Sequence, residues 1–333
     1  MSLPVSPSPH AEVLVGPPGA EALGIAETPF QQVWRTFRRD HLAMLGLSVL
    51  LTLVVLALLG KILTEWWVVF DPATVRLPDK LLPPFSARSA SLAPELSPPG
   101  GIYPFGTDEL GRNVFARMLQ GSFVSLSVGI VAVSISLSIG ITVGGLAGFY
   151  GQRKVGPLSV DSWLMRFTDV VLCFPTFFLI LTVVALLPPS IYNIMIVIGI
   201  TSWMGTARFV RAEFLALREQ EFVTAAHALG LPEWRIIFRH MVPNALAPVL
   251  VSATVDVAYA ILTESALSFL GFGVRPPYAT WGNILADGRS YIFDAPWLFV
   301  IPGSAILVVV LSFNLVGEGL RDALNPKLRK RAS

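Results

Sequence analysis

Two acidic residues lie inside an otherwise uncharged, apolar stretch near the carboxyl end of the chain. Asp256 and Glu264 fall within Ala245–Leu270, which is long enough to cross a bilayer as a helix. A charge in a membrane helix is costly and is retained where it faces a pathway or a partner helix. Both residues are therefore candidates for facing a solute pathway. Asp256 is expected to face the pathway or a partner helix, and Glu264, near the outer end of the span, is a candidate for meeting an amino group of the solute. For Glu264, packing against a neighbouring helix is an equally good interpretation.

No combination of residues favours catalysis. The four histidines, His10, His41, His227 and His240, are scattered, and no His-Glu-x-x-His motif occurs. The single cysteine, Cys173, cannot form an internal disulfide or a multi-cysteine metal site. A Gly-x-x-x-x-Gly-Lys-Ser/Thr phosphate loop is also absent, so any use of ATP requires a partner. The sequence predicts a protein that is not an enzyme, with no metal and no cofactor.

A charged, helix-forming segment interrupts the apolar runs. Residues 221–244 read EFVTAAHALGLPEWRIIFRHMVPN, and Phe222, Ala225, Ala226 and Leu229 form one apolar helical stripe. The small alanines would let another surface approach closely, and an exposed apolar patch marks a docking site. The alternative is a hairpin packed on its own membrane helices.

The same segment contains the signals of a tight turn between two helices. Gly230 is typical of the residue just after a helix, and Pro232 of the first residue of the next one. We expect Pro243 to end the second helix. The pattern predicts a compact helix–turn–helix.

The elements that must position these residues are membrane helices. The chain has 333 residues, of which 53% are hydrophobic and 14% charged, whereas soluble proteins carry about 25% charged residues. A net charge of +2 gives no reason to expect nucleic acid as a partner. The sequence predicts an all-α integral membrane protein with six transmembrane helices, at residues 42–60, 123–149, 167–187, 191–209, 245–270 and 295–316.

The distribution of positive charge predicts the orientation. With the N-terminus inside, 16 of the 24 Lys and Arg residues fall in cytoplasmic segments, as the positive-inside rule requires. We therefore expect both termini in the cytoplasm. The segment 212–243 then lies on the cytoplasmic side.

Five regions follow from these spans. They are a disordered cytoplasmic tail (1–29), a first transmembrane helix (30–63), an external loop with an interfacial helix (64–121), a transmembrane core (122–320) and a cytoplasmic C-terminal tail (321–333). In the external loop, Thr107 is expected to cap a short helix with Val114, Phe115, Met118 and Leu119 on its apolar face. Residues Gly140, Gly144 and Gly148 repeat at the spacing that lets membrane helices pack closely.

The polar segment resembles the cytoplasmic signature of bacterial ABC importer permeases, Glu-Ala-Ala-x3-Gly-x9-Ile-x-Leu-Pro. Thr224–Ala226, Gly230 and Pro243 match it in spacing. Thr224 replaces the acidic residue of the signature, His240 the isoleucine and Val242 the leucine.

Further motifs resemble the second (C-type) permease subunit of dipeptide and oligopeptide importers. They include FGTDELGRNVFARMLQGSFVSLSVGI, MRFTDVVLCFPTFFLIL, ESALSFLGFGVRPP, TWGNILADGR and GLRDALNPKLR, and the likeness covers roughly residues 30–330 in order. It implies a type I ABC importer permease fold in the plasma membrane. It also implies a homologous second permease, two cytosolic ABC ATPases, an extracytoplasmic solute-binding protein and peptide substrates.

In this family the polar segment is the coupling helix, which seats in a groove of an ATPase. The resemblance assigns that role to Phe222, Thr224, Ala225, Ala226, Gly230, Pro232 and Pro243. Because Thr224 is uncharged, we expect shape and apolar packing rather than a charge pair at that position.

Other interpretations remain open. Importers of nickel, glutathione and opines share these motifs, so the solute is not fixed. A self-sufficient secondary transporter or channel would also have six spans and buried acids, but it would leave the docking segment without a purpose.

Overall fold

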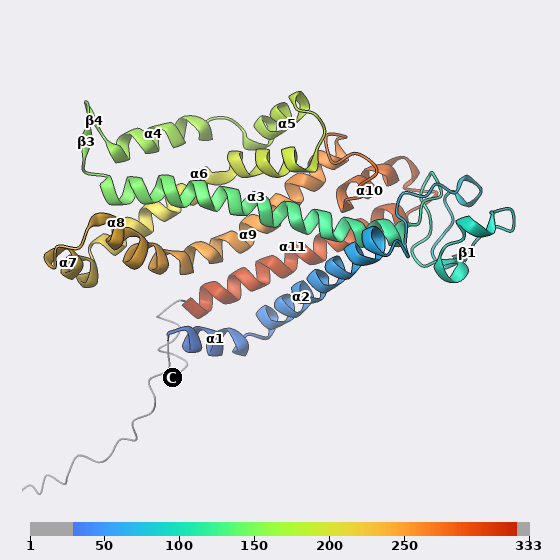
Figure 1. Ribbon diagram of the computed structural model, residues 1–333, viewed down its shortest axis with the longest axis horizontal. Coiled ribbons are helices and arrows are strands. Elements are labelled where there is room, and N and C mark those ends of the chain that lie inside the picture. Colours follow the sequence, from blue (N-terminus) through green and yellow to red (C-terminus); the bar gives the residue numbers. More distant parts are fainter. Residues whose placement is uncertain (1–28, 325–333) are drawn as a thin grey trace, which may run out of the picture.

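The computed structural model describes residues 29–324 (Figure 1). The predicted tail of residues 1–28 and the basic residues beyond 324 lie outside this range. The helices are α1 (Pro29–Arg39), α2 (His41–Lys61), α3 (Val114–Tyr150), α4 (Val160–Leu172), α5 (Thr176–Leu186), α6 (Ile191–Arg218), α7 (Glu221–Ala228), α8 (Glu233–Arg235), α9 (Val242–Phe269), α10 (Trp281–Gly288) and α11 (Trp297–Leu324).

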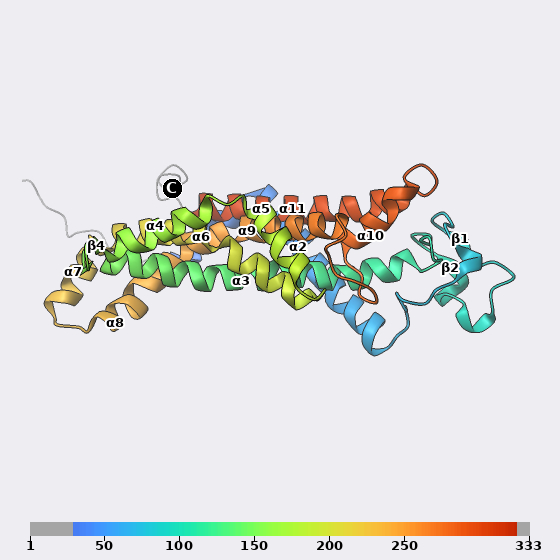
Figure 2. The same cartoon turned by 90° about the horizontal axis from the view of Figure 1, so that it is seen from above.

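Short elements connect them. Two antiparallel pairs of two-residue strands occur, β1 (Ser86–Ala87) with β2 (Ile102–Tyr103) and β3 (Lys154–Val155) with β4 (Leu158–Ser159). The short helical turns are Ile62–Trp66, Leu77–Asp79, Pro94–Leu96, Pro99–Gly101, Ile236–Met241 and Arg289–Tyr291. Figure 2 shows an elongated bundle, with α7 and α8 at one end and β1 and β2 at the other.

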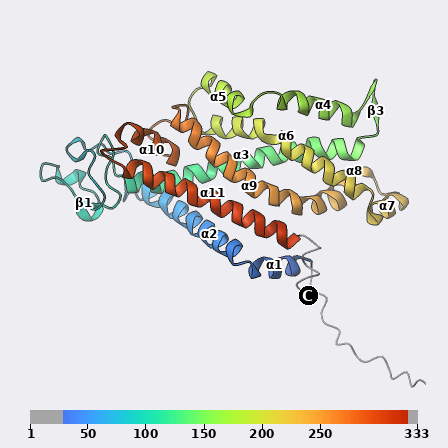
Figure 3. The same ribbon diagram turned by 180° about the vertical axis from the view of Figure 1, so that it is seen from behind.

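The prediction of a six-span helical protein is confirmed. Within residues 29–324, five helices are long and apolar enough to cross a membrane, and the α4–α5 pair makes a sixth crossing if it is counted as one span. Figure 3 shows α2 and α11 side by side on one edge of the bundle. Several helices extend past their predicted ends; α6, for example, runs on to Arg218.

The third span is broken, which the sequence analysis did not predict. The expected helix 167–187 is divided into α4 and α5, with an angle of 76° between them. Pro175 precedes α5 and is extended, with ψ at 111°. Proline has no N–H to donate and collides with the carbonyl four residues earlier, so it disrupts a helix at this point.

The predicted interfacial helix before the second span is wrong. Asn113 caps α3, because its side-chain oxygen accepts hydrogen bonds from the N–H groups of Phe115 and Ala116. Val114 and Met118 are therefore in the first turns of a continuous membrane helix. The expected cap, Thr107, instead accepts a hydrogen bond from the Leu82 N–H at 2.8 Å.

The predicted glycine contact is confirmed as the seam between α3 and α6. A Cβ at Gly140 would lie 2.7 Å from the Thr206 side chain, and one at Gly144 would lie 2.3 Å from the Ala207 carbonyl oxygen. A Cβ at Gly148 would meet Phe214 at 2.5 Å. The backbones of the two helices are thus too close for any larger residue.

Residues 67–113 form a folded cap at the β1 end rather than an open loop. Its centre is Asp79, which is fully buried and accepts hydrogen bonds from the Ser89 N–H at 3.0 Å and the Tyr103 hydroxyl at 2.6 Å. Burial alone would raise the pKa of Asp79, but these hydrogen bonds outweigh it and hold the pKa below its ordinary value. The same contact and burial raise the pKa of Tyr103.

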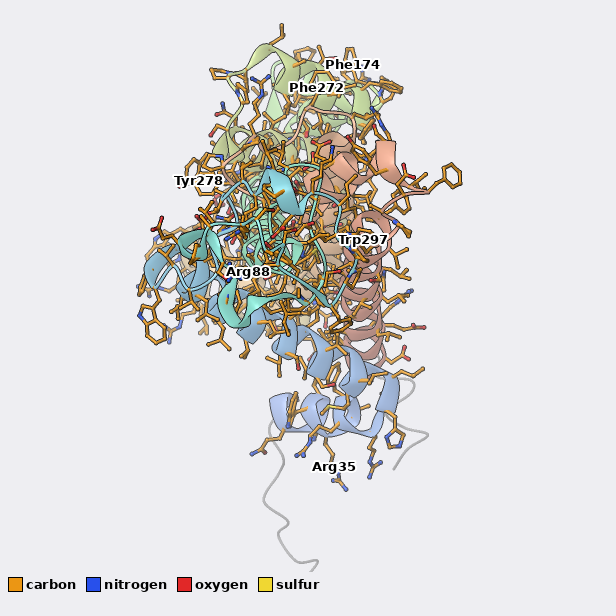
Figure 4. All side chains as sticks on the ribbon, turned by 90° about the vertical axis from the view of Figure 1, so that its right-hand side faces the viewer. Arg35, Arg88, Phe174, Phe272, Tyr278 and Trp297 are labelled. Carbon is orange, nitrogen blue, oxygen red and sulfur yellow. The ribbon has the colours of Figure 1, made fainter. Side chains whose placement is uncertain are left out.

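Four charged side chains fasten this cap to the membrane helices. Arg117 of α3 contacts Asp108 at 2.6 Å and Asp287 of α10 at 2.9 Å. Arg112 contacts the same two carboxylates at 2.7 and 3.2 Å. Trp297, labelled with Arg88 in the view onto this end (Figure 4), donates to the Thr107 carbonyl at 3.2 Å. The two positive and two negative charges balance, so the cluster can be buried.

Candidate functional site

The polar segment folds as the predicted helix–turn–helix. α7 ends just before Gly230, which has a φ of +71°. The Leu231 N–H donates to the Ala226 carbonyl at 3.2 Å, and the Gly230 N–H donates to the His227 carbonyl at 2.9 Å. These bonds close the helix end, and glycine adopts the left-handed conformation there without the strain of a Cβ.

The two prolines have different roles from those expected. Pro232 is the residue before α8, not its first residue, with ψ at 142°. Pro243 does not end the second helix, since one continuous helical stretch runs from Glu233 to Phe269. A π-helical turn at Ile236–Met241 lies just before this proline. Pro243 has no N–H to donate to the preceding turn. The wider π-helical turn shifts the hydrogen-bonding pattern at this point, so the helix continues through the proline.

The predicted apolar stripe of α7 is divided between two faces. Ala226 is 4% exposed and Val223 is fully buried, and both pack with Phe149 and Phe214. Ala226 therefore anchors α7 to its own protein and is not available to a partner. Val223 was not predicted as a site residue, because it lies at the edge of the predicted stripe, where the helical pattern does not say which face it belongs to.

The outward face retains a row of apolar side chains. Phe222, Ala225 and Leu229 are exposed, and Leu229 is 79% exposed. Trp234 and Phe238 extend the surface, at 59% and 69% exposure. We call this apolar surface at the tip of the molecule the α7 patch, and it consists of Phe222, Ala225, Leu229, Trp234 and Phe238.

Thr224 contributes no charge to this patch. Its hydroxyl donates to the Gln220 carbonyl at 3.3 Å, within the first turn of its own helix. The prediction of contact by shape rather than by charge stays a prediction, and the local hydrogen bond of Thr224 is compatible with it.

Contacts with α3 and the loop after it hold the α7 patch in place. Glu233 forms an ion pair with Arg153, and the His227 ring stacks on Phe149 with centroids 6.1 Å apart. Arg218, at the end of α6, donates to the Phe149 carbonyl at 3.4 Å. These residues were not predicted as site residues, because their partners are about 70 to 80 positions away in sequence.

Asp256 lines two hollows in the membrane region. One hollow is bounded by α3, α5, α6 and α9, and the other by α6, α9 and α11. Asp256 is partly exposed and lines both. Its assignment to a solute pathway stays a prediction.

Glu264 is not a pathway residue. It is fully buried, and one carboxylate oxygen accepts a hydrogen bond from Ser268 at 2.6 Å. The other carboxylate oxygen has no hydrogen-bond partner. Because the side chain is enclosed by α9 and its neighbours, the pathway assignment is wrong for Glu264 and the packing alternative is correct.

The described residues contain no group of three or more His, Cys, Asp or Glu side chains placed to hold a metal ion.

Comparison with known proteins identifies the family. The sequence profile described as "binding-protein-dependent transport system inner membrane component" matches residues 140–330. A second profile, the "N-terminal TM domain of oligopeptide transport permease C", matches residues 28–84. The chain belongs to the binding-protein-dependent permease family. It is therefore a multi-pass membrane transport subunit of the dipeptide and oligopeptide branch.

Several curated relatives match along nearly their whole length. The dipeptide permease protein DppC of Alkalihalophilus pseudofirmus is 36% identical over 96% of this chain and 98% of that protein. The di/tripeptide permease protein DppC of Pseudomonas aeruginosa is 38% identical over 95% and 98%. The oligopeptide permease protein OppC of Bacillus subtilis is 36% identical over 88% of each chain. This coverage extends the family assignment to both ends of the described fold.

Proposed function

We propose that this chain is the permease subunit of an ABC importer that carries dipeptides and oligopeptides across the plasma membrane. In this proposal it pairs with a homologous permease, two cytosolic ATPases drive the complex, and an extracytoplasmic binding protein delivers the peptide. The observation that carries this proposal is the α7 patch, an apolar surface held at one tip of this chain. The chain itself is similar to peptide permeases.

The patch serves as the coupling surface in this mechanism. Phe222, Ala225 and Leu229 seat in a groove of the ATPase, and Gly230 shapes the turn beside them. Ion pairing of Glu233 to Arg153 ties the seated loop to the loop that follows α3. Closure of the ATPases would then displace the loop, and the displacement would reach the membrane helices through α6 and α9.

Reconstitution tests the proposal. Proteoliposomes containing both permeases and both ATPases, supplied with the binding protein, should take up labelled dipeptide only when ATP is inside. Labelled nickel and glutathione serve as competing solutes. Uptake of one of these without peptide uptake would contradict the peptide assignment, and solute movement by this chain alone down an ion gradient would contradict the importer assignment.

A further inference from the structure

Asp256 is an acidic residue without a partner in the middle of α9. Within residues 29–324, its carboxylate makes no hydrogen bond and no ion pair, whereas Asp161 and Asp169 are each paired with an arginine of α6. An unpaired carboxylate is expensive in a membrane region and calls for a cationic ligand. Asp256 is therefore unexplained by the packing of this chain.

The surroundings of Asp256 are polar on one side. The hollow between α3, α5, α6 and α9 includes the polar or small residues Ser136, Thr176, Thr201, Ser202, Gly205 and Tyr259. Asp256 is the single charged side chain that lines it. The Thr201 hydroxyl donates to the Val197 carbonyl at 2.7 Å, so its oxygen remains able to accept a hydrogen bond from a ligand.

The second hollow leads from Asp256 toward the end of the bundle that carries the α7 patch. It is lined by Pro248 and Ser252 on the first turns of α9 and by Glu318 and Arg321 on the last turns of α11. Asp256 is the one residue that lines both hollows. The Asp256 side chain is thus accessible from both hollows.

We propose that Asp256 binds the N-terminal ammonium group of a peptide in transit, with the hydroxyl oxygens of the first hollow accepting its remaining hydrogen bonds. This inference rests on the proposed function. An ammonium group has three donors and a unit positive charge, which suit one carboxylate with hydroxyl groups around it. A calcium ion takes several oxygen ligands, usually including more than one carboxylate, and the described residues hold no group of three or more His, Cys, Asp or Glu side chains placed for a metal.

Direct measurement of peptide binding tests this assignment. The complete permease–ATPase complex in detergent, without binding protein, is titrated with a radiolabelled tripeptide and with its N-acetylated form. We expect the wild-type complex to prefer the free-amine peptide, and Asp256→Asn to weaken binding of that peptide about tenfold, or ~1.4 kcal/mol. Binding of the acetylated peptide should stay unchanged.

Glu213→Gln supplies the matched control, since Glu213 is an acid on α6 that lines neither hollow. It should bind both peptides as the wild type does. Equal losses of both peptides in Asp256→Asn, or no loss of either, would overturn the assignment, and so would a wild-type complex that transports peptide but binds none. Absence of ATP-driven peptide uptake by the wild type would instead count against the proposed function.

Discussion

The two adjacent alanines of α7, Ala225 and Ala226, have different surroundings, although the sequence predicted one role for both. Ala226 packs inside the protein, while Ala225 faces outward. Sequence periodicity predicted a stripe but could not say which edge of it is covered by α3 and α6. The side that is buried depends on Phe149 and Phe214, which lie far away in sequence.

Leucine substitutions should separate these two roles. Ala226→Leu overpacks the cluster around Phe149 and should lower the free energy of unfolding by about 1–3 kcal/mol. Ala225→Leu should leave thermal stability unchanged but reduce co-purification of the ATPases, because it alters the outward surface. Thermal melting and pull-down of the detergent-solubilised complex measure both. The reverse pattern would contradict the assignment of Ala226 to the buried face and Ala225 to the outward face. In that pattern Ala225→Leu lowers thermal stability, and Ala226→Leu only reduces co-purification of the ATPases.

Among the elements, the α3–α6 seam was the feature best predicted from the sequence. Three glycines at four-residue spacing indicate a close helix contact wherever they occur in a membrane helix. The partner helix was beyond prediction, because nothing in that spacing identifies α6. The broken third span was missed because hydropathy is continuous across Pro175, although a proline within a helical pattern itself indicates a break or kink.

Alanine substitutions test the seam. Gly144→Ala places a methyl group against the Ala207 carbonyl and should destabilise the protein by about 1–3 kcal/mol. Gly205→Ala, on α6 itself, should have little effect, since no atom lies within 4 Å of the added carbon. Thermal unfolding in detergent distinguishes them. Equal stabilities of the two variants would mean that α3 and α6 are not in backbone contact.

The folded cap should respond to acid. The pKa of Asp79 is lowered in the folded state, so its contribution is complete above the ordinary pKa of about 3.9 and is lost as the pH falls through the lowered value. Asp79→Asn should remove a charge-assisted contribution of about 1.5–3 kcal/mol at neutral pH.

Hydrogen exchange of residues 67–113 measures this loss of stability in the cap. Protection factors, which compare each amide with its intrinsic exchange rate at the same pH, should be high in the wild-type cap at neutral pH and should fall below the lowered pKa. Asp79→Asn should have lower protection factors than the wild type at neutral pH. Tyr103→Phe is the control, because it removes one hydrogen bond and retains the Ser89 contact. Exchange in Asp79→Asn as slow as in the wild type would show that the carboxylate does not hold the cap together.

At the scale of the whole molecule, the α7 patch and the folded cap lie at opposite ends of the bundle (Figure 1). The fold class and number of spans followed from composition and apolar run length, which are whole-chain properties. The orientation of the bundle in the membrane stays a prediction from positive charge.

Single cysteines test that orientation. In a Cys173→Ser background, needed because Cys173 is exposed, Phe85→Cys in the cap should react with an impermeant maleimide in intact spheroplasts. Leu229→Cys in the α7 patch, in cells that lack the partner ATPases, should react only after permeabilisation. Both side chains are 79% exposed, so accessibility in the fold itself is matched. Labelling of Leu229→Cys before permeabilisation would reverse the predicted orientation.

The glycine seam has a mechanical consequence. Because Gly140, Gly144 and Gly148 of α3 lie directly against α6, the two helices can hardly slide or separate, so they turn together as one rigid unit. The 28 residues of α6 span ~42 Å. Rotations of ~15° are known between protein subunits. If α6 rotated by this angle about its midpoint, its two ends would move ~5 Å in opposite directions, about one helical pitch. A small push beside α7 would thus be transmitted along the bundle to its opposite end without bending either helix.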